Sequence, residues 1–242
     1  NLHIADTNFG MYRRDREICE SLKEAHDQYG WPMQIMSTTG KNNKERVIDI
    51  TSIMGDIFKV NMSIQSMNTQ VLSNVKRDNI KMEDYITIND HLNKEGRATK
   101  GELILGLPGE TRESFLSGLD QLIETGVSTM TVFTMMLLHG TAFQEPEYRQ
   151  RYEMVGKFRI VPLNFGEYAG ERVMDSEEVC IQTKDMSFDD YLYIRGYALL
   201  IEALHNGRPF EELFRYAASL GINRTTILRR VYENLNLAPE EV

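Results

Sequence analysis

The chain has 242 residues, of which 41% are hydrophobic, so it is long enough for one large domain or for a domain with an accessory region. Its formal net charge of −9 argues against a broad nucleic-acid-binding surface, and no apolar run approaches the length of a membrane span. The two cysteines, Cys19 and Cys180, lack the spacing of a metal site, and no secretory signal is visible, so we expect a cytoplasmic protein.

The first part of the chain alternates between short apolar strands and amphipathic helices that end at glycine. We predict strands at about 2–5, 33–37, 58–65, 100–105 and 129–138, with helices between them. Such an alternation is typical of a parallel β-sheet with helical crossovers, either open or curled into a barrel.

From Gln144 onward this alternation ends. We predict short strands at 159–163 and 177–183 with a loop between them, then helices at about 191–205, 210–220 and 224–235. The predicted architecture is therefore an α/β partial barrel over residues 1–143, followed by a mainly helical C-terminal appendage over residues 144–242.

The segment 100–111 reads K-G-E-L-I-L-G-L-P-G-E-T and predicts a buried strand, a tight turn and a helix start. Gly106 and Gly109 bracket the proline of the turn, and Thr111 is suited to cap the following helix. Glu102 lies within the apolar strand, where a carboxylate needs a partner.

Polar residues follow the predicted strands, at the end where parallel α/β folds place their sites. We expect Asp6, Thr39, Gln65 and the loop 106–109 to surround one cavity. The polar residues of this rim are Asp6, Asn8, Thr38, Thr39, Ser63, Gln65 and His139. The set is poor in nucleophiles and bases, which favours ligand binding over acid–base hydrolysis.

Taken singly, several of these residues have simpler explanations. Glu102 is equally consistent with a structural ion pair, and Arg77 with a solvated cation at a helix end. Asp6 and Asn8 are equally consistent with a turn or a helix cap.

Together the motifs resemble a known family. The run Ser63-Ile64-Gln65-Ser66, followed by Val71-Leu72 and Lys76-Arg77, is similar to the fourth-strand signature of radical SAM enzymes. The segment 100–111 resembles the fifth strand and turn of the same enzymes. Residues 6–10 resemble a segment of the cobalamin-binding class, which includes the anaerobic magnesium-protoporphyrin ester cyclase.

The resemblance implies that Gln65, Arg77 and Glu102 contact S-adenosylmethionine, with the arginine clamping the methionine carboxylate. The chain departs from many relatives at Thr38-Thr39, where those relatives carry a ribose-binding glutamate. The cofactor-binding residues that follow from the motifs and their places in the fold are Asp6, Asn8, Thr39, Ser63, Gln65, Arg77, Glu102 and Gly106.

The implied function is that of the SAM-binding portion of a radical SAM enzyme. In this class a 4Fe–4S cluster cleaves S-adenosylmethionine reductively and starts radical methylation, cyclisation or rearrangement of an organic substrate. The implied partners are a small-molecule substrate and an electron donor such as flavodoxin or ferredoxin, with no nucleic acid and no membrane.

The C-x-x-x-C-x-x-C motif that holds the cluster does not occur, and the sequence begins at Asn1 instead of methionine. We therefore expect a fragment, inactive alone, with the cluster ligands and any cobalamin domain upstream. The strand at 2–5 is expected at an exposed sheet edge, where a dimer contact or fraying would follow. Alternatives are a cobalamin-independent radical SAM member, similar to methylthiotransferases or coproporphyrinogen dehydrogenases, and a non-catalytic α/β barrel that acts as a binding module.

Overall fold

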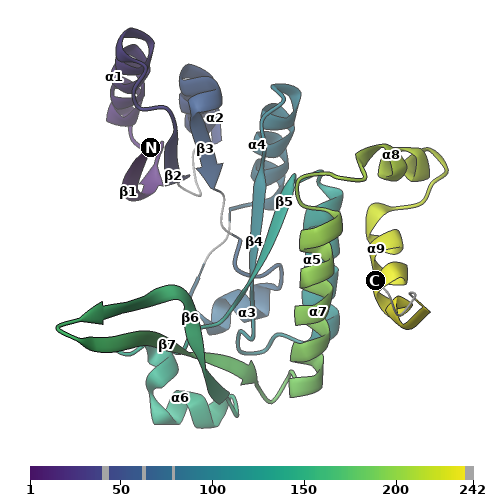
Figure 1. Ribbon diagram of the computed structural model, residues 1–242. Coiled ribbons are helices and arrows are strands. Elements are labelled where there is room, and N and C mark those ends of the chain that lie inside the picture. The colour runs from purple at the N-terminus through teal and green to yellow at the C-terminus, as the bar shows by residue number, and fades with distance from the viewer. Residues whose placement is uncertain (40–43, 62–63, 78–79, 238–242) are drawn as a thin grey trace.

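The computed structural model describes residues 1–39, 44–61, 64–77 and 80–237. Its first part is an α/β fold, as predicted, in which parallel strands alternate with helices (Figure 1). The elements of this part are β1 (Leu2–Phe9), α1 (Arg13–Tyr29), β2 (Ile35–Thr39), α2 (Lys44–Met54), β3 (Phe58–Asn61), α3 (Thr69–Asn74), α4 (Met82–Lys94), β4 (Lys100–Leu105), α5 (Arg112–Glu124) and β5 (Thr129–Thr134).

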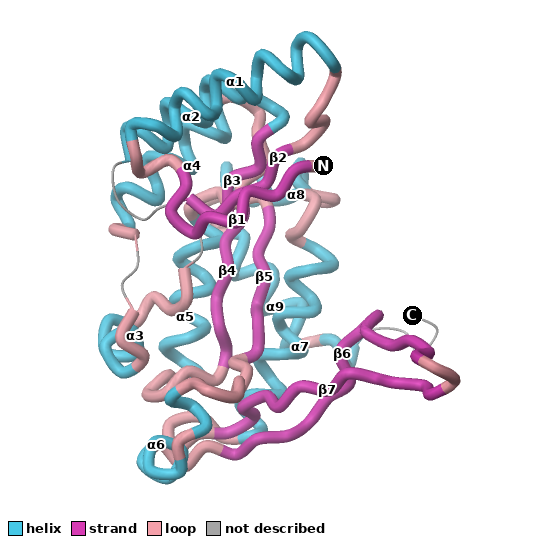
Figure 2. Tube along the Cα trace, turned by 90° about the vertical axis from the view of Figure 1, so that its left-hand side faces the viewer, coloured by secondary structure: helices cyan, strands magenta, loops and turns pink. Residues whose placement is uncertain are grey.

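Strands β1, β2 and β3 form a parallel sheet in that order, so β1 lies at the edge of this sheet, as predicted. Residues alternate between its two faces: Ile35, Ser37 and Thr39 are buried, whereas Met36 is 38% exposed. The buried face packs against α1 and α2, which lie side by side on it (Figure 2).

Strands β4 and β5 form a second parallel pair, in which Glu102 is opposite Thr131. Within the described ranges no ladder joins β3 to β4, but the backbone N–H of Ile104 donates to the carbonyl of Gln65 over 2.9 Å. Gln65 therefore lies beside β4, and the described strands do not form a closed barrel.

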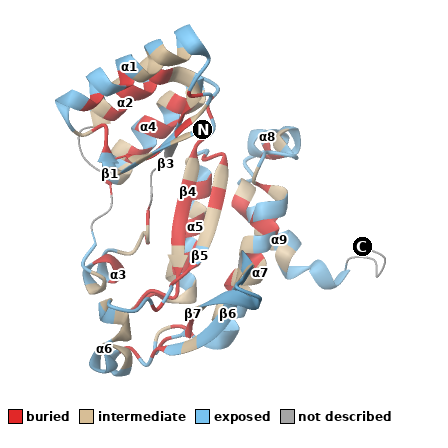
Figure 3. Cartoon of the chain, turned by 60° about the vertical axis from the view of Figure 1, so that its left-hand side comes forward, coloured by how far each residue is buried: buried red, intermediate tan, exposed pale blue. Residues whose placement is uncertain are grey.

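The predicted helix after the glycine turn is confirmed. The Thr111 hydroxyl accepts a hydrogen bond from the N–H of Ser114 over 3.2 Å and so caps α5. The apolar residues of the predicted face, Phe115, Leu116, Leu119, Leu122 and Ile123, are all at most 5% exposed. They bury this face of α5 in the main core, which Figure 3 shows in red behind β4 and β5.

The second part of the chain consists of α6 (Pro146–Arg151), β6 (Val155–Tyr168), β7 (Glu171–Gln182), α7 (Phe188–Leu204), α8 (Glu211–Ser219) and α9 (Arg224–Glu233). The three predicted helices are present. The predicted loop at 164–170 is wrong, because β6 continues to Tyr168 and pairs antiparallel with β7 in a long hairpin that projects from the body (Figure 1). Its tip turns at Ala169 and Gly170, whose φ angles of 52° and 84° suit a tight hairpin turn.

Helix α7 covers the outer edge of β5. The side-chain amide of Asn206 both accepts from the backbone N–H of Met130 and donates to its carbonyl, over 2.7 and 2.8 Å. Arg195 donates to the carbonyl of Val132 over 3.0 Å. These side chains occupy the backbone groups that a further strand would need, so the sheet ends at β5.

Candidate functional site

The residues of β4 divide between two faces, and this division sets the candidate site. Leu103 and Leu105 are at most 1% exposed and belong to the core beneath the helices. Lys100, Glu102 and Ile104 alternate with them and therefore project from the opposite side, toward the open face of the sheets. We call this side the concave face.

Glu102 is only 9% exposed, and it has the partner that its position requires. The Lys100 ammonium lies 2.7 Å from its carboxylate, two residues earlier on the same strand. The ammonium also lies 5.8 Å from the centre of the Phe133 ring on β5. The ion pair agrees with the simpler explanation of Glu102 and leaves its ligand role a prediction.

Two of the other predicted residues lie near Glu102. Gln65 is half-buried, and its carbonyl bonds to Ile104 as described above. Gly106 follows β4 directly with a φ of 91°, a conformation that favours glycine. A Cβ atom on Gly106 would approach the backbone oxygen of Cys180 to 3.2 Å, so β7 packs closely over this turn.

A buried carboxylate that the sequence did not single out joins the two motifs. Glu110 is 1% exposed and accepts hydrogen bonds from the hydroxyls of Ser66 and Ser114. Its burial raises the pKa of this carboxyl group above the ordinary value. Glu110 thus fixes the segment that carries Gln65 against the loop after β4. The contact with Ser66 gave no local sequence signal, because Ser66 is 44 residues away from Glu110.

The predicted residues of the first sheet form a separate group. The Asp6 carboxylate accepts from the N–H of Asn8 over 2.8 Å, which shapes a local turn where the pairing of β1 with β2 is irregular. Thr39 pairs in register with Phe9 and is buried on the helix-covered face. Thr38, which alternates with Thr39 along β2, belongs to the opposite face, and a cofactor contact at Thr39 remains a prediction.

Of the remaining two predicted residues, only Arg77 lies within the described part of the chain. Arg77 follows α3, is exposed, and donates its backbone N–H to the carbonyl of Leu72 over 3.0 Å. The end of α3 is tied to the glycine loop, because the Asn74 amide donates to the carbonyl of Pro108 over 2.9 Å. Ser63 lies outside the described residues.

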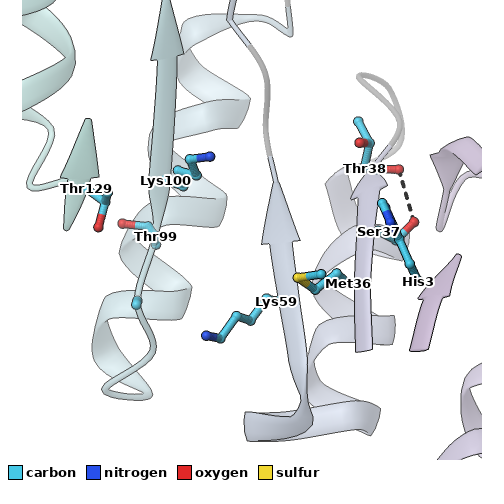
Figure 4. A pocket seen from close by; sticks show the side chains of 9 residues that line it. His3, Met36, Ser37, Thr38, Lys59, Thr99, Lys100 and Thr129 are labelled. Carbon is cyan, nitrogen blue, oxygen red and sulfur yellow. Dashed lines mark hydrogen bonds between the residues drawn. The ribbon is translucent and has the colours of Figure 1, made fainter. Parts of the chain in front are cut away.

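A cavity of about 360 Å³ opens on the concave face. Met36 and Lys59 project into it from β2 and β3, opposite Lys100 at the start of β4 and Thr99 just before that strand (Figure 4). Thr38 also lines it, but Asp6, Thr39, Gln65 and the loop 106–109 do not. This pocket is therefore not the cavity that we predicted around those residues. It lies toward the starts of β4 and β5.

The cysteines are not suited to hold a metal cluster. Cys19 lies in α1 and Cys180 in β7, and both are 0% exposed. Burial raises the pKa of their thiols to about 12 and about 11, which disfavours the thiolate that binds metal. Across the ranges that the structure describes, no three His, Cys, Asp or Glu side chains gather as a metal site, and no helix is long and apolar enough to cross a membrane.

The chain has clear relatives among known proteins, although no protein-family model matches it. It is 32% identical over 214 residues to the cobalamin-dependent radical SAM methyltransferase TokK of Streptomyces tokunonensis, covering 86% of this chain and 31% of the relative. It is 30% identical over 250 residues to the 2-(S-pantetheinyl)-carbapenam-3-carboxylate methyltransferase of Streptantibioticus cattleyicolor, covering 100% of this chain and 36% of the relative. The chain thus spans about a third of the length of these curated relatives.

Among solved structures, the radical S-adenosylmethionine methyltransferase TsrM from Kitasatospora setae matches with a TM-score of 0.45. That structure holds a tryptophan substrate and a SAM analogue. It is 16% identical in sequence, and the match covers 55% of this chain and 27% of TsrM. The resemblance that the motifs suggested is confirmed by the two curated relatives.

Proposed function

This chain is a homologue of cobalamin-dependent radical SAM methyltransferases, and we propose that it is the S-adenosylmethionine-binding part of such an enzyme. The substrate of the whole enzyme is a small organic molecule. The observation that carries the proposal is the hydrogen bond of Gln65 to Ile104 of β4, midway along the strand between Glu102 and the Gly106 turn. These residues come from the two motifs that resemble the family.

The residues near Glu102 suit S-adenosylmethionine in their chemistry. Glu102 is a nearly buried carboxylate on the concave face, able to accept hydrogen bonds from ribose hydroxyls or from an ammonium group. The Gln65 amide both donates and accepts, so it is suited to the adenosyl or methionyl polar groups. Because β7 approaches Gly106 closely, a side chain at this position would crowd the backbone of β7. In our proposal the peptide groups of the Gly106 turn lie near the cofactor.

The chain's own residues bind and orient the cofactor and exclude water in this proposal. Arg77 is exposed, and we assign it to the methionine carboxylate, for which a planar guanidinium is suited. When bound, S-adenosylmethionine supplies the methyl group or the radical for the reaction. Asp6 and Asn8 remain proposed contacts at the neighbouring strand end.

The 4Fe–4S cluster and cobalamin would not be held by the described residues of this chain. The two buried thiols lie in separate elements, and the described residues include no group of three His, Cys, Asp or Glu side chains that could hold a metal. In our proposal these groups and an electron donor such as flavodoxin or ferredoxin bind elsewhere in the enzyme. The edge strand β1 is a proposed contact with another chain, since its outer backbone groups are suited to pairing.

Equilibrium titration of S-adenosylmethionine into the whole enzyme tests the proposal. Replacing Gln65, Arg77 or Glu102 by alanine should weaken binding, and Arg77→Ala should cost about 1.5–3 kcal/mol, as expected for a charge-assisted hydrogen bond. Arg151→Ala is a matched control, because Arg151 lies in α6 and is exposed. Unchanged affinity in all three variants would reject the assignment.

A further inference from the structure

We propose that one face of the β6–β7 hairpin is a docking surface for another domain of the same enzyme, which lies outside this chain and presents an apolar, uncharged surface. The face consists of Phe158, Ile160, Phe165 and Met174, and we call it the hairpin face. The inference rests on the proposed function in one respect, namely that the chain is part of a larger enzyme. It does not depend on which residues bind S-adenosylmethionine.

The pairing of the two strands places these four side chains on the same side. Phe165 lies directly opposite Met174, and directly opposed residues of antiparallel strands share a face. The partners of Ile160 and Phe158 lie two and four residues after Met174 along β7, so they also share its face. Neither strand alternates regularly along its whole length, and the hairpin face therefore arises from the pairing.

The opposite face of the hairpin carries charges suited to solvent. Lys157 and Arg159 alternate with the apolar residues of β6 and therefore project to that side. The Nε atom of Arg159 donates to the Glu177 carboxylate over 2.6 Å. Asp175 lies two residues before Glu177 and shares its face. The two sides of the hairpin thus differ in character.

The charged residues of the hairpin face are confined to its two ends. Glu178 lies opposite Phe158 at the base, where its carboxylate is 2.7 Å from the Arg149 guanidinium. Glu167 and Arg172 lie opposite each other near the tip. The stretch between these ends is uncharged, which suits an apolar partner surface, because such a contact leaves no charge buried without a partner.

The hairpin face is uncovered in this chain. Each of its four apolar residues is at least 60% exposed. Together they present roughly 400–500 Å² of apolar surface, judged from the area that side chains of this size bury. Contiguous exposed apolar patches of this size commonly mark interaction sites.

The area of the hairpin face favours a domain of the same polypeptide over a second copy of the chain. A stable dimer buries about 800 Å² on each partner, more than this face supplies. A domain joined by the chain needs less, because the connection raises its effective concentration to about the millimolar range. The chain covers 31% and 36% of its two curated relatives, so most of such an enzyme lies outside these residues.

The position of the hairpin also favours this occupant. The N–H of Cys180 donates to the carbonyl of Met135 over 2.9 Å, and the N–H of Leu137 donates to the carbonyl of Glu178 over 2.8 Å. The base of β7 is therefore anchored just beyond the carboxyl end of β5, and the hairpin projects from there (Figure 1). Parallel α/β folds hold their reactants at this end, so a domain that closes over it would meet the hairpin.

Cysteine labelling of the whole enzyme tests the proposal, because Cys19 and Cys180 are buried and should react slowly. A new thiol is introduced by Met174→Cys on the hairpin face or by Tyr168→Cys. Tyr168 pairs with Glu171, three residues before Met174, and so lies on the opposite face. The two positions are 66% and 69% exposed in this chain, so they are matched unless a partner covers one of them.

Each variant is labelled with N-ethylmaleimide under anaerobic conditions without added S-adenosylmethionine, and the labelled peptide is measured by mass spectrometry. The rate is divided by that of the same variant unfolded in urea. We expect the thiol of Met174→Cys to react at least about fivefold more slowly than that of Tyr168→Cys. Adding Phe165→Ser to Met174→Cys should remove most of this difference, whereas Val173→Ser, on the opposite face, should not.

Equal rates at the two positions, or a difference that Phe165→Ser leaves intact, would overturn the proposal. A difference that disappears on dilution of the protein by about a hundredfold would assign the face to a second copy and would also overturn it. Titration of S-adenosylmethionine into the same variants separates this inference from the proposed function. Protection at position 174 in an enzyme that does not bind S-adenosylmethionine would overturn only the proposed function, and binding with equal labelling would overturn only the docking surface.

Discussion

Replacement of Glu110 by alanine should destabilise the protein and loosen the candidate site at the same time. The Glu110 carboxylate accepts hydrogen bonds from Ser66 and Ser114, and Ser66 is itself 1% exposed. The variant therefore leaves a cavity and a buried hydroxyl without its acceptor. It also removes the contact that holds the segment of Gln65 against the loop after β4.

The expected cost follows from these two contacts. A hydrogen bond to a charged group contributes about 1.5–3 kcal/mol, and the desolvation of the carboxylate offsets part of this. We expect Glu110→Ala to lower the free energy of unfolding by about 2–4 kcal/mol and Glu110→Gln, which keeps one acceptor and the volume, by about 1 kcal/mol. Glu113→Ala, at an exposed position in the first turn of α5, should change it by less than about 0.5 kcal/mol.

The pH dependence gives a second test of the same contact. Burial raises the pKa of Glu110 in the folded protein above its unfolded value of 4.5. The stability that this shift contributes is present below the unfolded pKa and is lost as the pH rises through the folded pKa. The destabilisation by Glu110→Gln should therefore be larger near pH 4 than near pH 7.

Urea unfolding followed by circular dichroism, for wild type and the three variants, measures these differences. An alanine variant at Glu110 that is as stable as the Glu113 control would contradict the buried network. A destabilisation by glutamine that grows from acid to neutral pH would contradict the assigned pKa shift.

Three further predictions concern the rim of the site, the cluster and the second part of the chain. Gly106→Ala should lower the free energy of unfolding by about 1–3 kcal/mol, which is more than the effect of Gly126→Ala. Both glycines have positive φ angles, but only at Gly106 would an added Cβ atom closely approach a backbone atom. Equal urea midpoints for the two variants would contradict this prediction. The purified chain should stay colourless when it is reconstituted with iron and sulfide under anaerobic conditions, because Cys19 and Cys180 are buried and lie in separate elements. A stable iron–sulfur absorbance with stoichiometric iron would contradict this prediction. Ser187→Ala should cost about 1 kcal/mol in thermal or urea unfolding, because the Ser187 hydroxyl caps α7, and an unchanged stability would show that this cap is dispensable.

The sequence predicted best the elements whose signals are local. The apolar spacing on α5 and its threonine cap depend on neighbours within a few turns, and both are confirmed. The glycine turn at Gly106 is likewise encoded by its own residues. The side of the sheet that Thr39 faces depends on the pairing of β2 with its neighbours, so its burial beneath the helices was not evident from the sequence.

Features that depend on distant partners were not predictable in the same way. The strands of the β6–β7 hairpin are largely exposed, so their apolar residues do not alternate with polar ones as in a half-buried strand. The buried role of Glu110 becomes evident only when its segment and that of Ser66 are brought together. The cavity on the concave face likewise arises from residues of β1 to β5, which are separate in the sequence.

A crystal structure of the whole enzyme with bound S-adenosylmethionine tests the central claim most directly. The account predicts density for the cofactor on the concave face, with its polar groups within hydrogen-bond distance of Gln65 and Glu102 and its methionine carboxylate at Arg77. Cofactor bound away from these residues, or a complex in which Glu102 keeps only its contact with Lys100, would contradict the assignment of this chain as the S-adenosylmethionine-binding part.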